Sequence, residues 1–250
     1  MGECSKLLIL SKQARSLWAK TGQEEGELWL PLFAHLCDTC LVMDRLYCEW
    51  LPSGIRRLIA RFAGNDESRA FRLVRFLAAV HDIGKATPVF QAKAVRSFLG
   101  GAVRSLLWKP EKAGLPIRTE LTGSRKPSHS VAGQVVVERY FGNKYGLTPD
   151  SVRSLSSIVG AHHGKPPGRD ARSETENAKM AELGWDKRSE GSWRSVQFEL
   201  LDLACTLSGF DESDVRFSPN AVYRYSLKAS CVAWSSWRTG LPATRVCSRW

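Results

Sequence analysis

The sequence predicts a mainly helical protein, and three observations support this prediction. Apolar residues recur at helical spacing in several segments, cap residues and glycines mark the ends of those segments, and no alternating strand pattern of useful length occurs before residue 215. The chain has 250 residues, of which 43% are hydrophobic, so it can bury a sizeable core in one large domain or two small ones. The expected fold class is therefore all-α.

Two helices are predicted in the first third of the chain. Residues 28–51 carry apolar side chains on two faces, so we expect a central helix there, with Pro31 in its first turn. Asn65 or Asp66 is suited to cap a second helix, which should end near Gly84. Both helices should therefore contribute to the core.

The second half of the chain predicts four more helices separated by polar loops. Ser128 is expected to cap one helix that runs through Phe141, and Thr148-Pro149 is expected to start another. The helix that starts at Thr148-Pro149 is expected to end at 162–164. We also expect a loop at 109–127, a basic loop at 165–172, and helices near 174–183 and 192–208.

The formal net charge is +11, which favours a polyanionic partner such as nucleic acid, although an acidic protein surface or lipid also fits. Four basic residues are candidates for lining a bound strand, and for any one of them a solvated loop is the simpler interpretation. They are Lys165, Arg169, Arg172 and Lys187.

No apolar run approaches the roughly 18 residues of a membrane span, and Leu7 to Leu10 is too short for the apolar core of a signal peptide. Seven cysteines without a secretion signal argue against a disulfide framework. Cys37 and Cys40 are expected to be two small buried residues on one helix face. We expect a cytoplasmic protein without membrane contact, and a monomer.

The distribution of histidine is the most informative feature for function. The chain has five histidines, and each lies in or beside a predicted helix terminus or apolar helix. Taken singly, each has an ordinary explanation, such as a core histidine or a solvated helix end. The joint pattern, with a carboxylate directly after one histidine, indicates a metal site. The candidate ligands are His35, His81, Asp82, His129, His162 and His163.

These residue types suit a particular chemistry. Imidazole binds Mn, Fe, Co, Ni and Zn, and a carboxylate has two oxygens with which it can bridge two metals. Two metals about 3.5–4 Å apart can activate a water and stabilise both oxygens of an in-line phosphoryl displacement. Asp82 is the natural shared ligand. Lys85 lies about one helical turn after His81, so it is a candidate to contact a phosphate or the leaving group.

Several motifs resemble the N-terminal HD nuclease domain of the CRISPR-associated helicase-nuclease of type I systems, most closely the type I-E branch. The resemblance covers roughly residues 10–210. It rests on LWAK (17–20), WLPLFAHLCDT (29–39), FLAAVHDIGKATPVFQAK (76–93), SHSVAGQ (128–134) and IVGAHHGKPP (158–167), which occur in the order of the family.

The resemblance implies an all-helical HD fold that degrades single-stranded DNA with two divalent transition-metal ions (Mn, Fe, Co or Ni, with Mg as an alternative). It also implies a fused or separate helicase and recruitment by an RNA-guided surveillance complex. Carried over by motif, the five histidines and Asp82 become metal ligands, and Asp82 and Lys85 become the catalytic residues.

The sequence departs from the family near its end. The family supplies a late aspartate within a stretch resembling VIVADWLASN, whereas residues 221–250 contain no Asp or Glu, five Lys or Arg and three tryptophans. Back-translation of residues 233–244 with permitted codons, read from the third nucleotide, gives Met-Val-Ile-Val-Ala-Asp-Trp-Leu-Ala-Ser-Asn. In that frame the missing aspartate codon straddles Arg238 and Thr239.

This match to the family stretch in a shifted frame predicts a frameshift between about Pro219 and Ala233. We therefore expect an HD nuclease domain over residues 1–220, an out-of-frame tail over 221–250, and no helicase domain, in agreement with the lack of a GxxxxGK[ST] phosphate loop. Loss of the late aspartate should weaken metal binding and lower nuclease activity. Asp202, Asp211 and Asp214 are possible substitutes that no local pattern recommends.

Two alternatives follow from the same residues. One is an HD phosphohydrolase that acts on nucleotides or cyclic dinucleotides, for which a closed pocket with base-specific contacts is expected. The other is an inactive nucleic-acid-binding remnant, which would bind DNA without retaining two metals. A diverged C-terminal segment with its own fold is the alternative to the frameshift.

Overall fold

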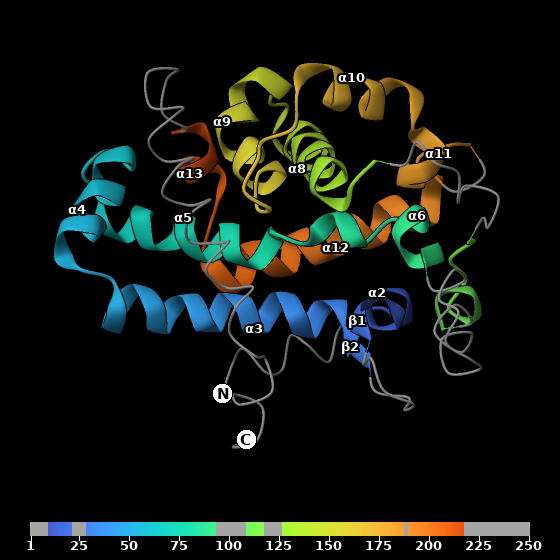
Figure 1. Cartoon of the computed structure of the whole chain (residues 1–250), viewed down its shortest axis with the longest axis horizontal. Coiled ribbons are helices and arrows are strands. Elements are labelled where there is room, and N and C mark those ends of the chain that lie inside the picture. The colour runs from blue at the N-terminus through green and yellow to red at the C-terminus, as the bar shows by residue number, and fades with distance from the viewer. Residues whose placement is uncertain (1–9, 22–28, 94–108, 118–126, 188–189, 218–250) are drawn as a thin grey trace.

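Long helices with apolar faces form the core of the fold in the computed structural model, which describes residues 10–21, 29–93, 109–117, 127–187 and 190–217. In Figure 1, α3, α5 and α12 run lengthwise, and α8, α9 and α10 lie above them. The helices are α2 (Lys12–Ser16), α3 (Leu32–Arg45), α4 (Ser53–Phe62), α5 (Glu67–Val80), α6 (Pro88–Gln91), α8 (His129–Tyr145), α9 (Pro149–Gly160), α10 (Arg169–Ala178), α11 (Met180–Leu183), α12 (Glu190–Ser208) and α13 (Glu212–Arg216).

The apolar faces of α3, α5, α8, α9 and α12 meet in one main core cluster. Its largest fully buried side chains include Trp193, Tyr140, Phe76 and Phe141. A smaller cluster joins the far end of α3 to α4 and α5 around Met43. The all-α prediction is confirmed, and within the described residues no helix is both long and apolar enough to cross a bilayer.

Three predicted helix caps are confirmed. The side chain of Asp66 accepts a hydrogen bond from the backbone N–H of Arg69, and Ser128 and Thr148 cap α8 and α9 in the same way. Cys37 and Cys40 are buried on α3, as expected. These caps fix where the segments that carry the histidines begin.

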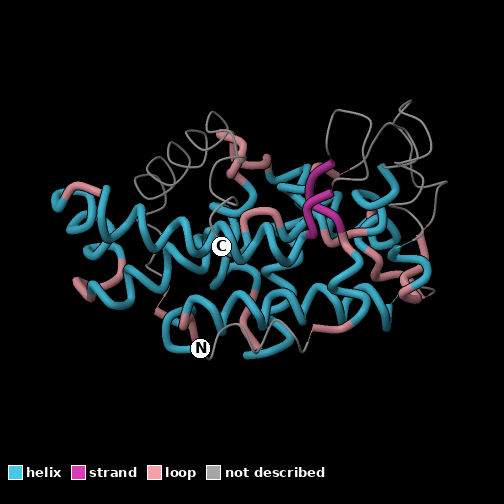
Figure 2. Tube along the Cα trace, turned by 90° about the horizontal axis from the view of Figure 1, so that it is seen from below, coloured by secondary structure: helices cyan, strands magenta, loops and turns pink. Residues whose placement is uncertain are grey.

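The sequence pattern did not reveal two short strands in the N-terminal region. β1 (Trp18–Thr21) and β2 (Trp29–Pro31) form a two-stranded antiparallel sheet, which Figure 2 shows in magenta among the helices. The strands have four and three residues, too short for a readable alternation. The predicted 28–51 helix therefore begins at Leu32, and Pro31 caps α3 instead of lying in its first turn.

Other boundaries also moved. A π-helical turn, η1 (Leu46–Trp50), closes the segment after α3, and a short 3₁₀ turn, η2 (Ile83–Lys85), follows α5. Residues 109–112 are helical where a loop was predicted, and α10 begins at Arg169 inside the predicted basic loop. The helices α2, α4, α6 and α13 were not predicted. The predicted tail, 221–250, lies outside the described residues.

Candidate metal centre

Asp82 lies at a sharp turn directly after the end of α5. His81 caps α5, and Asp82 caps η2. Gly84 allows this turn to approach α8 closely, since a Cβ atom on Gly84 would lie 1.8 Å from the carbonyl oxygen of His129. The turn is thereby held against the first residue of α8, and the Asp82 side chain is buried.

Two histidines reach one oxygen of the Asp82 carboxylate. His35, on the buried face of α3, places Nε2 2.8 Å from Asp82 Oδ2. His81 places Nε2 3.2 Å from the same oxygen. The ligand atoms of these three residues lie within 4.8 Å of one another, so they could hold one metal ion.

Two further histidines reach the other oxygen. His129 Nε2 lies 3.2 Å and His162 Nε2 lies 3.4 Å from Asp82 Oδ1. His163 completes this second group, because its Nε2 atom lies 2.8 Å from His129 Nε2. His129, His162 and His163 could hold a second ion. Four histidines therefore meet around the two oxygens of the Asp82 carboxylate, and His163 joins them through His129.

The hydrogen bonds on the outer side of two rings indicate that this site fits a cation. His81 Nδ1–H donates to the carbonyl oxygen of Ala78 at 2.8 Å, and His162 Nδ1–H donates to that of Val159 at 2.7 Å. A neutral ring that donates through Nδ1 presents the lone pair of Nε2, here toward a carboxylate oxygen. The Nε2 lone pair and the carboxylate oxygen are both acceptors, and a cation between them would satisfy both.

Burial also keeps several imidazoles in the metal-binding form. Burial lowers the pKa of His35 to about 4, despite the opposing hydrogen bond to Asp82. The pKa of His163 is likewise lowered to about 4, although its side chain is exposed, by the partial removal of its ring from water and by the neighbouring His162 and His129. The pKa of His129 is lowered too, mainly by burial. Neutral imidazole nitrogen is the form that coordinates a metal.

For Asp82, burial alone would raise the pKa, but the surrounding histidines outweigh it and hold the pKa well below its usual value. Lys85 adds a further cation, with Nζ 2.8 Å from Asp82 Oδ2 and 3.2 Å from the carbonyl oxygen of Ala19. The carboxylate is therefore ionised and available for coordination across the ordinary pH range.

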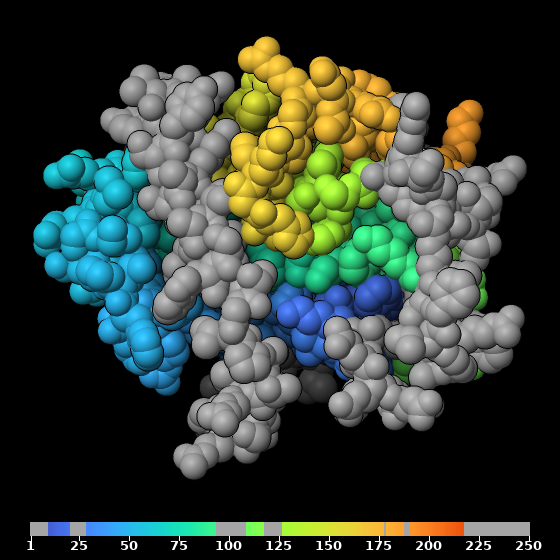
Figure 3. Space-filling view, in the orientation of Figure 1, coloured from blue at the N-terminus to red at the C-terminus, as the bar shows by residue number. Residues whose placement is uncertain are grey.

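The site opens to the surface at the loop after α9. His162 is buried, whereas His163 and Lys165 are exposed. In Figure 3 this loop, in yellow, adjoins the yellow-green start of α8 and the green segment that holds α6. A substrate could therefore approach the candidate metal ions from this face.

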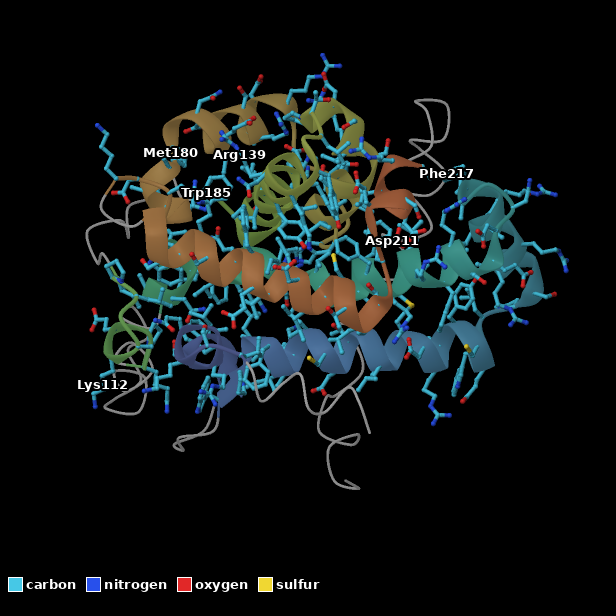
Figure 4. The ribbon with its side chains drawn as sticks, turned by 180° about the vertical axis from the view of Figure 1, so that it is seen from behind. Lys112, Arg139, Met180, Trp185, Asp211 and Phe217 are labelled. Carbon is cyan, nitrogen blue, oxygen red and sulfur yellow. The ribbon has the colours of Figure 1, made fainter. Side chains whose placement is uncertain are left out.

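None of the three suggested substitutes for the late aspartate contacts the candidate ligands. Asp214 is paired with Arg72 at 2.6 Å, Asp202 accepts a hydrogen bond from Tyr140, and Asp211 caps α13. Figure 4 shows Asp211 beside α13, toward the opposite end of the molecule from Trp185.

Arg172, a candidate for lining a bound strand for which a solvated loop was the simpler interpretation, lies in α10 and is held in an ion pair. Its guanidinium is largely buried in an ion pair with Glu138, whereas Lys165, Arg169 and Lys187 are exposed. The sequence prediction also missed the polar side chains that support the site. Gln91 lay in a quoted motif without a role, and Gln197 carried no signal.

Comparisons with known proteins show what this chain is similar to. A family model described as "Cas3, HD domain" matches residues 18–241. The chain is 34% identical over 78% of its length to a CRISPR-associated nuclease/helicase Cas3 from Streptococcus thermophilus, and 29% identical over 91% to a CRISPR-associated endonuclease/helicase Cas3 from Thermus thermophilus. It spans 21% and 22% of those relatives.

A solved structure described as a CRISPR-associated protein is similar in fold, with a TM-score of 0.68 and 26% sequence identity. That similarity covers 90% of this chain and 22% of the other.

Proposed function

Since this chain belongs to the family of Cas3 HD domains, we propose that it is a metal-dependent nuclease domain that cuts single-stranded DNA in CRISPR interference. One observation carries the proposal. The two oxygens of Asp82 each face a separate group of histidines, which is the arrangement that two metal ions bridged by one carboxylate require.

We assign the six candidate ligands to two cations. His35, His81 and Asp82 Oδ2 would hold one, and His129, His162, His163 and Asp82 Oδ1 the other. The imidazole nitrogens suit Fe, Co or Ni and the shared carboxylate suits Mn, with Mg as a weaker alternative. When bound, such a pair of ions activates water and stabilises charge on a phosphate.

The remaining residues of the site would act on the substrate. Lys85 is the one lysine within 3 Å of Asp82 among the described residues, so its ammonium is suited to contact a non-bridging phosphate oxygen or the leaving group. The exposed Lys165 lies beside the doublet of histidines and would attract the phosphate backbone without reading its sequence.

Partners follow from the relatives, which are named as nucleases joined to helicases. We propose that a helicase, in the same or another chain, delivers the strand to this site, and that an RNA-guided surveillance complex recruits it. A type I-E system is the branch that the HDIGKATPVFQ motif favours. Loss of the late aspartate would weaken one metal site, which predicts reduced activity.

The test is a cleavage assay on circular single-stranded DNA with Mn, Fe, Co, Ni or Mg, with Asp82→Ala as the control. Cleavage that requires both the metal and Asp82 is the expected result. Hydrolysis of nucleotides or cyclic dinucleotides in place of DNA would contradict the choice of substrate. DNA binding with no cleavage under any metal would contradict the enzymatic proposal.

A further inference from the structure

We infer that Gln91 and Gln197 are positioning residues that hold Lys85 against Asp82 and thereby set how tightly the His35 group binds a divalent cation. The inference rests on the proposed function, because it takes this group to be a metal site. Neither glutamine contacts a candidate ligand side chain in the described structure, so both would act through Lys85.

Gln91 is fully buried at the end of α6 and uses its whole amide group. Its Nε2 atom donates to the carbonyl oxygens of Lys85 and Trp18, each at 2.9 Å. Its Oε1 atom accepts from the backbone N–H of Trp18 at 3.2 Å. Gln91 therefore joins the turn that carries Lys85 to strand β1.

Gln197 reaches the same turn from α12 and is also fully buried. Its Nε2 atom donates to the carbonyl oxygens of Ala86 and Leu183, each at 2.8 Å. Its Oε1 atom accepts from the indole N–H of Trp185 at 2.6 Å. Two glutamines from different elements thus bind consecutive carbonyl groups, those of Lys85 and Ala86.

This arrangement fixes the backbone from which the Lys85 side chain extends. Rotation of that turn would break buried hydrogen bonds on both of its sides, and a buried carbonyl without a partner is costly. With its backbone held, Lys85 places Nζ between Asp82 Oδ2 and the carbonyl oxygen of Ala19. The acceptor on Ala19 belongs to β1, the strand that Gln91 anchors.

An ammonium group at Asp82 Oδ2 opposes a second cation at the same oxygen, because like charges repel strongly in a buried site. A well-placed Lys85 therefore weakens metal binding by His35 and His81 while it stays ready for phosphate. Loosening Lys85 should relieve the repulsion, so the metal should bind more tightly and the strand should be cut more slowly.

The test is calorimetric titration of Mn²⁺ into the full chain. Lys85→Ala should tighten the binding that His35→Ala abolishes. Gln91→Met and Gln197→Met should change affinity in the same direction, by about threefold or more, and should have no further effect in the Lys85→Ala background. Tyr140→Phe is the control, since it removes a partly buried hydrogen bond to Asp202 and should leave Mn²⁺ affinity unchanged.

Equal effects of the glutamine substitutions in both backgrounds would overturn the inference, because they would show a general loss of structure. Should the methionine variants fail to fold, nuclear magnetic resonance of the wild-type chain decides. The side-chain amide signals of Gln91 and Gln197 should shift when Zn²⁺ is added, and should shift much less in Lys85→Ala. Identical responses in both proteins would refute the coupling.

These outcomes separate the inference from the proposed function. Mn²⁺ binding without any DNA cleavage would refute the nuclease proposal and leave the role of the glutamines standing. Additive effects on Mn²⁺ affinity in a chain that cuts DNA would refute only the role of the glutamines. No Mn²⁺ binding at all would refute both.

Discussion

At the scale of single residues, the site depends on how one carboxylate is shared. Asp82 is surrounded by four imidazoles within 3.4 Å and by the ammonium of Lys85. The ammonium of Lys85 already balances the charge of this buried anion, so folding does not require four imidazoles beside it. Metal binding explains why the imidazoles meet there.

The lowered pKa of His35 makes a prediction about the metal-free chain. The unfolded residue titrates near 6.5 and the folded one near 4, so the unfolded state binds more protons between these pH values. The stability from neutral His35 is complete above pH 6.5 and is lost as the pH falls toward 4. With about 1.4 kcal/mol per pKa unit, the loss is about 3 kcal/mol.

Urea unfolding of the metal-free chain at pH 7 and pH 4.5 measures this effect. His35→Gln cannot take up a proton there, so its free energy of unfolding should fall less than that of the wild type over the same interval. Parallel losses in the two proteins would contradict the assigned pKa.

At the scale of elements, the close approach of η2 and α8 brings the two histidine groups together. A Cβ atom on Gly84 would lie 1.8 Å from the His129 carbonyl oxygen and 2.6 Å from the backbone N of Gly133. Gly84→Ala should therefore destabilise the fold by about 2–3 kcal/mol or more, by forcing these backbones apart.

Gly54 is the matched control, because a Cβ atom there would meet nothing within 4 Å. Gly54 lies in α4, so its replacement by alanine should be neutral or stabilising by up to about 1 kcal/mol. Thermal unfolding of both variants checks the pair. Equal melting temperatures would show that η2 and α8 can accommodate a Cβ atom at Gly84 without moving apart.

A buried ion pair anchors α10, and with it one end of the loop that carries His162 and His163. Arg172 binds the buried carboxylate of Glu138 on α8 at 2.5 Å, and Ser156 on α9 donates to the same carboxylate at 2.8 Å. Arg172→Met should cost about 3–5 kcal/mol, because it leaves the charge of Glu138 buried without a partner.

The exposed pair of Arg216 with Glu212 provides the comparison, and Arg216→Met should cost about 1 kcal/mol or less. Adding Glu138→Gln to Arg172→Met should recover part of the loss, since it removes the unpaired charge. Denaturant unfolding of the single and double variants decides this. A double variant less stable than Arg172→Met would contradict the account.

The sequence predicted those parts of the fold and of the site that depend on residues close together in the chain. Caps such as Ser128 and the placement of each histidine relative to a helix end were readable, because they depend on neighbours in the chain. The β1–β2 pair was not, since strands of three and four residues show no periodicity. The roles of Gln197 and Arg172 depend on contacts across more than 30 residues of sequence, which no local pattern reveals.

At the scale of the whole molecule, the C-terminal segment is the remaining prediction. If residues 221–250 are read out of frame, the coding DNA should contain codons that give Val-Ile-Val-Ala-Asp-Trp-Leu-Ala-Ser-Asn in the shifted frame. Restoring that frame should supply a further carboxylate and increase both metal affinity and cleavage. Codons incompatible with the shifted peptide would rule out the frameshift hypothesis. The segment would then be a diverged C-terminal segment with its own fold.

The central claim is that the two oxygens of Asp82, each with its own group of histidines, would hold two cations. The most direct measurement is the number of Mn²⁺ or Ni²⁺ ions bound per chain at saturation, for the wild type, His35→Ala, His163→Ala and Asp82→Ala. The account predicts two ions for the wild type, one for each histidine variant and none retained tightly by Asp82→Ala. A single ion whose binding is unaffected by His35→Ala, or two ions that survive Asp82→Ala, would contradict it.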